Sequence, residues 1–310
     1  MVMIEVQHLR KEFDKVVAVK DLTLTVNGGD IYGFIGPNGA GKTTTIKMLA
    51  TLLKPTAGRA YVAGIDVVAH PEEVRGVIGY MPDFFGVYDD VKVWEYLDFF
   101  AAAYKIPRAQ RAQIIDDVLE LTDLTGKKDS FVEELSRGMK QRLCLAKTLV
   151  HDPKVLLLDE PASGLDPRAR IEIRELLKEL RAMGKTIFVS SHILSELADL
   201  CNTVGIIEAG ELIVSGHLDE IVEQVGLSRA FEIRALEGLE RAEAILREFP
   251  AVRDVWVEED RLGMELDGPL DEMPNILQAL LEGGVQVVTV REQTTDLEDI
   301  FMKLTKGTVA

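Results

Sequence analysis

Residues 36–43 read Gly-Pro-Asn-Gly-Ala-Gly-Lys-Thr, a complete G-x-x-x-x-G-K-[ST] phosphate-binding loop. The apolar run at 31–35 predicts a buried strand that leads into this loop, and residues 44–49 predict a helix that follows it. The glycines of the loop let successive backbone N–H groups turn toward phosphate oxygens, and the helix start adds partial positive charge. The stretch therefore predicts a site for a nucleoside triphosphate.

Two side chains of the loop carry specific chemistry. Lys42 can reach the β- and γ-phosphates, and the hydroxyl of Thr43 is placed to bind Mg²⁺. The alternative is a glycine-rich turn that happens to carry a surface lysine. The agreement of strand, spacing and helix argues against that alternative.

A second motif is the apolar run Val155–Leu158, which ends in Asp159, Glu160 and Pro161. An entirely apolar strand predicts burial on both faces, and carboxylates at its end need a compensating partner. A Mg²⁺ ion between Thr43 and Asp159 would supply one, which leaves Glu160 to orient or deprotonate an attacking water. The alternative is that both acids merely cap the following turn.

Two further features are weaker when taken alone. His192 closes the apolar run 186–191, where a neutral imidazole can hydrogen-bond the γ-phosphate, although a single histidine at a strand end is usually structural. Ser136 is a good N-cap for a helix over 138–150, and the free N–H groups beyond it form a second anion site. A dimer explains that second site, because each copy's Ser136 turn could close over the other copy's nucleotide. The alternative is a capped helix with a basic face.

The composition limits the remaining possibilities. A length of 310 residues with 47% apolar content suggests two packed domains. The N-terminus lacks the pattern of a secretory signal, no apolar run is long enough to span a bilayer, and two cysteines form no framework. We therefore expect a soluble, intracellular chain. Its net charge of −17 argues against a nucleic-acid partner and against autonomous membrane binding.

The order of elements predicts the fold class. Strand-like runs at 155–159, 186–191 and 203–208 alternate with helical patterns, which predicts an α/β nucleotide-binding domain with a mostly parallel core sheet. A β-rich layer precedes this core, and an all-helical insert over about 84–150 interrupts it. We place the domain at 1–227. Residues 228–310 then follow a β-α-β-β-α-β order, which predicts a small α+β domain of ferredoxin-like arrangement.

Together these motifs resemble the ATP-binding subunits of ABC transporters. The order is the phosphate loop, a switch strand ending near 83, a signature at 135–142, the acidic strand end, Ser-Gly-Leu-Asp at 163–166, and His192. The resemblance covers residues 1 to about 225. It implies that two nucleotide domains sandwich two ATP molecules with Mg²⁺, and that hydrolysis reopens them to drive membrane domains.

The resemblance also implies roles for single residues. Glu160 would be the catalytic base, helped by Lys42 and by His192 as γ-phosphate sensor. Phe13 matches an aromatic residue that stacks on adenine. The implied nucleotide-binding residues are Phe13, Gly36, Pro37, Asn38, Gly39, Ala40, Gly41, Lys42, Thr43, Thr44, Ser136 and Gly138. The implied metal ligands are Thr43, Asp159 and Asp83, and the implied dimer-interface residues are Ser163, Gly164, Leu165 and Asp166.

Two departures from the family pattern bear on these roles. Asp83 stands where the family usually has glutamine, so its metal role carries over weakly, although a carboxylate can still bind Mg²⁺. The signature reads Leu-Ser-Arg-Gly-Met, with Arg137 and Met139 in place of glycine and glutamine. The anion contacts come from Ser136 and backbone N–H groups, so we expect ATPase activity to survive both changes.

The tail resembles the accessory domain of bacterial drug, sodium and similar efflux subunits, which favours an exporter. The implied partners are a polytopic membrane permease and a second nucleotide-binding subunit, expected to be a copy of this chain. The protein would then be cytoplasmic and peripheral on the membrane through the permease. Aromatic residues between 94 and 104 would suit a groove for that partner, although helical spacing makes many of them plain core. Two alternatives stay open: a non-transport ABC ATPase that remodels DNA or ribosomes, and an importer subunit.

Overall fold

The computed structural model describes residues 1–84, 86, 88, 90–193, 197, 200–218, 220–221, 229–258, 261–267, 270–293 and 304. The chain forms two compact units that divide between Leu218 and Asp219. The domain boundary expected at 227/228 falls within 222–228, outside the described residues, and stays a prediction. Each unit is described by itself.

The first unit is built on one large sheet. Its strands are β1 (Val2–Phe13), β2 (Val16–Asn27), β3 (Ile31–Ile35), β4 (Ala57–Val62), β5 (Ile65–Asp66), β6 (Ile78–Met81), β7 (Val155–Asp159), β8 (Thr186–Ser191), β9 (Thr203–Glu208) and β10 (Glu211–His217). Its helices are α1 (Lys42–Leu49), α2 (Pro71–Val77), α3 (Val93–Ala103), α4 (Arg108–Leu121), α5 (Arg137–Leu149) and α6 (Pro167–Ala182), with 3₁₀ turns at Thr125–Lys127 and Val132–Glu134.

The strand order confirms the expected α/β class. The sheet runs β5-β4-β1-β2-β10-β9-β3-β8-β7-β6, and its β9-β3-β8-β7-β6 part is parallel throughout. The β-rich layer β5-β4-β1-β2 is antiparallel. Every residue of β3, β7, β8 and β9 is buried, as continuous apolar strands require. The carboxyl ends of β3, β7 and β8 therefore meet at one edge, where the phosphate loop begins.

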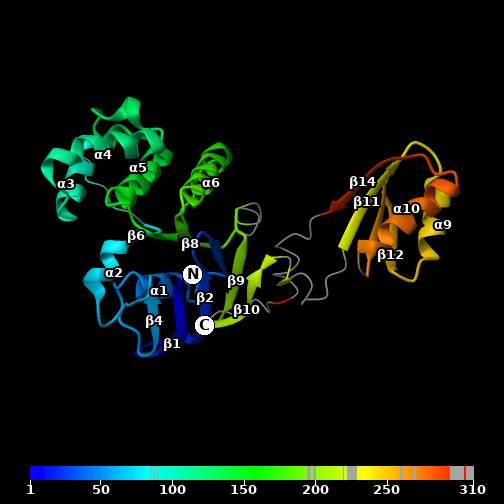
Figure 1. The fold of residues 1–310 in the computed structure, drawn as a ribbon, viewed down its shortest axis with the longest axis horizontal. Helices are drawn as coiled ribbons and strands as arrows, with labels where there is room; N and C mark the ends of the chain where they lie inside the picture. The colour runs from blue at the N-terminus through cyan, green and yellow to red at the C-terminus, as the bar shows by residue number, and fades with distance from the viewer. Residues whose placement is uncertain are drawn as a thin grey trace. The chain divides into compact units, whose positions relative to one another are not determined.

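The helical insert is present as expected. Helices α3, α4 and α5 pack on one another and form a group of their own in Figure 1. Helix α2 was not expected from the sequence. It has seven residues, of which only Val74 is buried, so it carries almost no helical periodicity. Most of the short helix expected at 193–200 lies outside the described residues.

The second unit is a four-stranded antiparallel sheet covered by two helices. Its elements are β11 (Arg229–Ala235), α9 (Leu239–Arg247), β12 (Val252–Glu258), β13 (Arg261–Leu266), a 3₁₀ turn (Leu270–Glu272), α10 (Met273–Glu282) and β14 (Val287–Gln293). The strand order β12-β13-β11-β14 is the ferredoxin-like arrangement. Nearly all of the last helix expected at 297–305 lies outside the described residues.

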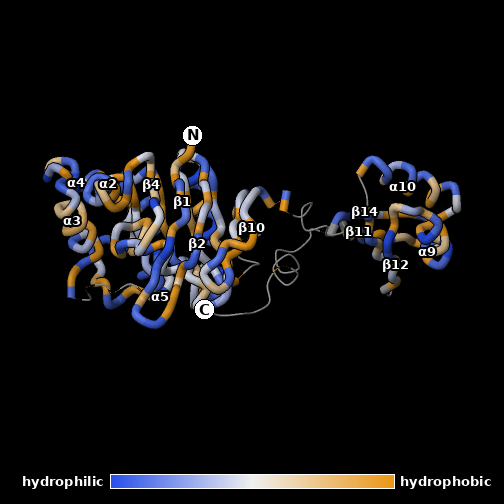
Figure 2. The backbone as a smooth tube through the Cα atoms, turned by 90° about the horizontal axis from the view of Figure 1, so that it is seen from below, coloured by the Kyte–Doolittle hydropathy of each residue, from blue (hydrophilic) through white to orange (hydrophobic). Residues whose placement is uncertain are grey.

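Each unit has a hydrophobic core of its own. In the first unit the core joins β1, β2 and β3 to α1, and within it the ring of Phe188 stacks on Tyr32 and is tilted against Phe34. In the second unit the core lies between the sheet and helices α9 and α10, around residues such as Phe231 and Leu246. Hydrophobic and hydrophilic stretches alternate along the backbone of both units in Figure 2. Two separate cores explain why the chain divides into two units.

Candidate functional site

The main chain of the phosphate loop packs so closely against neighbouring segments that two of its positions have room for glycine only. A side chain at Gly36 would collide with the carbonyl oxygen of Ile207, and its Cβ would lie 2.9 Å from the Cγ2 of that residue. A Cβ at Gly41 would lie 2.6 Å from the carbonyl oxygen of Ala18, and Gly41 also has a φ of 109°. Gly41 is the N-cap of α1 without any side-chain cap, so the first N–H groups of the helix stay available for an anion.

Lys42 is folded back onto the loop that carries it. Its Nζ donates to the carbonyl oxygens of Gly36 at 2.6 Å and Pro37 at 3.2 Å, and lies 3.7 Å from Oε1 of Glu160. The residue is only 6% exposed. Burial lowers the pKa of Lys42, and the negative charges of Glu160 and Asp159 oppose that shift. The ammonium group therefore balances the two carboxylates at the same edge of the sheet.

Asp159 is buried at the end of β7, and its two carboxylate oxygens differ in their contacts. Its Oδ1 accepts hydrogen bonds from Oγ of Ser190 at 2.7 Å and Oγ1 of Thr43 at 3.2 Å. In the part of the chain that the structure describes, its Oδ2 has no hydrogen-bond partner. A buried carboxylate oxygen without a partner, next to a threonine hydroxyl, fits the hard oxygen ligands that Mg²⁺ prefers.

Glu160 sits in a strained main-chain conformation. Its φ is 52°, in the left-handed region, and its N–H donates to the carbonyl oxygen of Ser190 at 3.2 Å and the hydroxyl of Ser190 at 3.1 Å. Its Oε2 lies 2.8 Å from Nδ1 of His192, and its side chain is 11% exposed. Strain of this kind persists only when surrounding contacts enforce it. Ser190 and His192, both from the end of β8, hold Glu160 between Lys42 and the solvent.

Lys42, Glu160 and His192 line one cavity of about 500 Å³, and Asp159 adjoins it through its hydrogen bond with Thr43, which is also in the lining. Its lining residues are Val16, Ala18, Asn38, Gly39, Gly41, Lys42, Thr43, Thr44, Asp83, Glu160, Ser163 and His192. Most of the expected catalytic, phosphate-loop and metal residues thus lie around one space. Gly36, Pro37 and Ala40 shape the loop behind it. Phe13 is 44% exposed at the end of β1 and pairs across the turn with Val16, which lines the cavity.

Two groups of site residues were missed at the level of sequence. Val16 and Ala18 line the cavity from β2, and nothing in their type distinguishes them. Ser190 was missed although it bonds Asp159 and the main chain of Glu160, and it had a recognisable signal: it is a polar residue directly after the apolar run 187–189 in a strand that is buried along its whole length. A buried polar side chain in such a strand requires a partner.

Several expected residues lie elsewhere in the chain. Ser136 caps α5, because its Oγ accepts a hydrogen bond from the N–H of Met139 at 3.3 Å, and neither it nor Gly138 lines the cavity. Asp166 caps α6 through a 3.0 Å bond from the N–H of Ala169. Leu165 is only 6% exposed within its own chain. These residues therefore form a second region, at the starts of α5 and α6.

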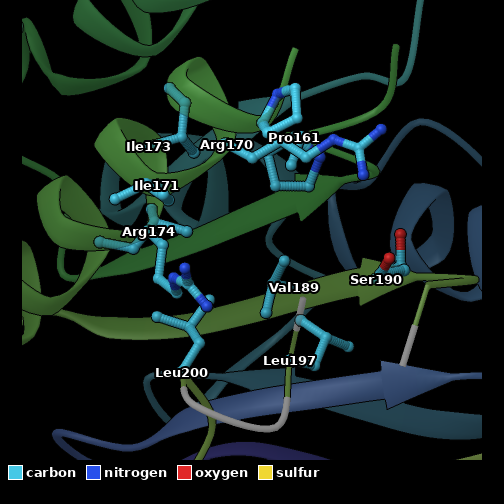
Figure 3. A pocket seen from close by; sticks show the side chains of 13 residues that line it. Pro161, Arg170, Ile171, Ile173, Arg174, Val189, Ser190, Leu197 and Leu200 are labelled. Carbon is cyan, nitrogen blue, oxygen red and sulfur yellow. The ribbon is translucent and has the colours of Figure 1, made fainter. Parts of the chain in front are cut away.

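A second hollow of about 280 Å³ lies between α6 and β8 and is shown in Figure 3. Side chains of α6 such as Ile173 and Arg174 line it opposite Val189, Ser190, Leu197 and Leu200. The hollow contains neither a glycine-rich loop nor the start of α1, so it lacks the features that bind a triphosphate. The cavity around Lys42 is the candidate site.

The described residues contain no group of three or more histidine, cysteine or acidic side chains arranged to hold a metal ion. A cation at this site would therefore depend on Thr43 and Asp159, with water and nucleotide oxygens as further ligands, as Mg²⁺ commonly does. Within the part of the chain that the structure describes, we find no helix with the length and apolarity that a bilayer crossing needs.

Comparisons with known proteins agree with this geometry. Residues 19–163 match the family described as ABC transporter, and residues 216–305 match the C-terminal domain of DrrA1-3-like ATP-binding proteins. The bacitracin transport ATP-binding protein BcrA of Bacillus licheniformis is 35% identical over 98% of this chain and 98% of its own. The Nod factor export ATP-binding protein I of Cupriavidus metallidurans is 34% identical over 98% and 97%. A solved ATP-binding subunit of an ABC transporter superposes with a TM-score of 0.66 at 31% identity, covering 72% of this chain and 93% of that one.

Proposed function

The chain belongs to the family of ABC transporter ATP-binding proteins, and we propose that it is the motor subunit of an exporter. It is an ATPase of that family. In the proposed cycle, ATP closes two nucleotide-binding subunits head to tail, and hydrolysis reopens them to drive a separate membrane permease. The observation that carries the proposal is that Lys42, Glu160 and His192 line one cavity, while Asp159 adjoins it through its hydrogen bond with Thr43.

The contacts support a division of labour in hydrolysis. Lys42 and the N–H groups of the loop bind the phosphates, because both are positive and face the cavity. Glu160 orients or deprotonates the attacking water, and its 2.8 Å contact with His192 keeps the carboxylate in place. Mg²⁺, held by Thr43 and Asp159, would neutralise charge that develops on the phosphates. Asp83 lines the same cavity and is proposed as a weaker metal ligand.

The second region supports closure with another copy. Ser136 and Gly138 begin α5 away from their own chain's cavity, so their N–H groups suit a nucleotide held by a partner. We assign Ser163, Gly164, Leu165 and Asp166 to the interface of that dimer. Leu165 would contribute through its main chain, because its side chain is buried in its own subunit.

The export direction is supported by the names of relatives that match nearly the whole chain. They include a bacitracin transport protein and a Nod factor export protein. A permease would dock on the helical insert, where rings of α3 and its flanks pack edge to face while Tyr88 and Phe99 stay 59% and 55% exposed. The protein would then lie on the cytoplasmic face of the membrane. We keep 1–227 and 228–310 as the two functional domains.

The proposal is tested by turnover and by co-purification. Purified chain with Mg·ATP should hydrolyse ATP, and a Glu160→Gln variant should lose most of that activity, by about 100-fold or more, while still binding nucleotide. If the wild type shows no turnover above the variant, with or without its membrane partner, the motor assignment is wrong. The chain should pull down a polytopic membrane protein. Recovery of DNA or ribosomes instead would favour a remodelling ATPase, and recovery with a substrate-binding protein would favour an importer.

A further inference from the structure

Arg137, the first residue of α5, reaches across to the loop that follows the catalytic acids. Its Nη2 donates to the carbonyl oxygen of Ser163 at 3.3 Å. Ser163 itself lines the nucleotide cavity. The side chain therefore connects the signature turn, residues 135–138, to the post-acid loop, residues 163–166, within one chain.

Gly164 makes room for this contact. It has a φ of +68° and no side chain, and its main chain is covered by the guanidinium of Arg137. A Cβ at Gly164 would lie 2.5 Å from Cζ and 2.8 Å from Nη1 of that arginine, and closer still to Nη2. The planar guanidinium thus occupies the place that a side chain at position 164 would take. A lysine ammonium has no such flat face.

Residues further along α5 make contacts of their own with neighbouring segments. Nε2 of Gln141, which is 2% exposed, donates to the carbonyl oxygen of Pro161. Arg142 pairs with Glu172 on α6 and with Asp123 at 2.8 Å. These contacts hold the middle of α5 without any help from Arg137. Of these three side chains, only that of Arg137 ties the first turn of α5, next to Ser136, to the post-acid loop.

We propose that Arg137 is a positioning residue that clips the signature turn to the post-acid loop of the same chain. Both segments are assigned above to the surface that meets a partner subunit, so the inference rests on the proposed function. With the clip in place, the two segments form one preorganised surface before the partner arrives. Preorganisation lowers the ordering cost of association. The arginine that departs from the family's signature would then stabilise closure instead of weakening it.

The first test uses the nucleotide-free monomer and needs no dimer. Amide hydrogen exchange is compared between wild type and Arg137→Ala at residues 163–166 and at the first turn of α5. We expect exchange in the post-acid loop to become roughly threefold faster or more, because its local opening is no longer opposed by the contact. An Arg181→Ala chain, which loses a 2.9 Å bond to the carbonyl oxygen of Gly29 far from this loop, is the matched control. Unchanged exchange at 163–166 would overturn the proposal.

The second test measures ATP-dependent dimerisation by light scattering or ultracentrifugation in a Glu160→Gln background. Arg137→Ala should weaken the dimer by about five- to tenfold while leaving ATP binding to the monomer unchanged. Gly164→Ala should have a similar effect, because it displaces the guanidinium while keeping the charge. The double variant should be little worse than either single one, since both remove one contact.

Arg137→Lys separates the clip from a simple charge effect. The clip predicts that lysine restores little of the dimer affinity. Full rescue by lysine, together with no effect of Gly164→Ala, would show that Arg137 acts through its charge on the partner's nucleotide and would overturn the proposal. A Glu160→Gln chain that never dimerises contradicts the proposed function instead, and the exchange measurement then decides the contact by itself.

Discussion

Replacing Ser190 by alanine removes the hydroxyl that connects the Asp159 carboxylate to the main chain of Glu160. The hydroxyl is fully buried, donates to Asp159 at 2.7 Å and accepts from the N–H of Glu160 at 3.1 Å. Loss of a buried hydrogen bond to a charged group costs about 1.5–3 kcal/mol, because the carboxylate keeps its desolvation penalty without the donor. Glu160 keeps a second acceptor for its N–H, the carbonyl oxygen of Ser190, so most of the cost falls on Asp159. We expect Ser190→Ala to lower the stability of the first unit by that amount.

The matched control is Thr186→Val, at the start of the same strand β8. The Thr186 hydroxyl is also buried, and it accepts a hydrogen bond from the uncharged main-chain N–H of Gly29 at 3.1 Å. We expect it to cost about 0.5–1.5 kcal/mol. Urea unfolding followed by Trp94 fluorescence in a Trp256→Phe background would report the first unit, since each unit contains one tryptophan. Equal losses for the Ser190 and Thr186 variants, with the same Mg²⁺ dependence of ATPase, would refute the assigned role of Ser190.

Three further predictions follow from single contacts. Gly36→Ala should weaken ATP binding by about tenfold or more, because its Cβ collides with the main chain of β9. Gly76→Ala should bind normally in the same fluorescent-nucleotide titration, because no atom of the described residues lies within 4 Å of the added Cβ. Burial lowers the pKa of His151 below 6.5. As pH falls, the unfolded state therefore binds a proton at this histidine before the folded state does. The stability that His151 contributes is complete above pH 6.5 and is lost as pH falls toward its folded pKa. A His151→Phe chain should show a flatter stability profile in that window, and a profile parallel to wild type would contradict the shift. Gly263→Ala should displace the indole of Trp256 and destabilise the second unit, while ATP binding, measured by the same titration, stays unchanged.

The parts of the fold that were predictable are those with strong local signals. The strands at 155–159, 186–191 and 203–208 were expected at their observed bounds, because short runs with an apolar centre, bounded by polar residues and turn signals, fit few other structures. The phosphate loop was predictable for a related reason: its chemistry requires particular residue types at fixed spacing. Helix α2 was not predictable, because its short sequence buries one side chain only.

The parts of the site that were not predictable depend on contacts between distant segments. The approach of Ser190 to Asp159 spans 31 residues, and that of Thr43 to Asp159 spans 116. Motif order can suggest that such groups share a site, but the pairing itself follows from the parallel register of β7 and β8. Arg137 illustrates the same limit. Its type departs from the family pattern, while its contact with the post-acid loop becomes visible only once α5 and α6 are packed together.

The contacts of Lys42 suggest how nucleotide binding is coupled to activation of the base. The lysine is held by two loop carbonyls and lies 3.7 Å from Glu160, so this carboxylate serves as its counter-ion. A triphosphate brings several negative charges to the same ammonium group, which then no longer needs the glutamate. Glu160 would keep its contact with His192 and face the water near the γ-phosphate. We therefore expect the carboxylate to become available as a base only after the triphosphate has taken its place beside Lys42.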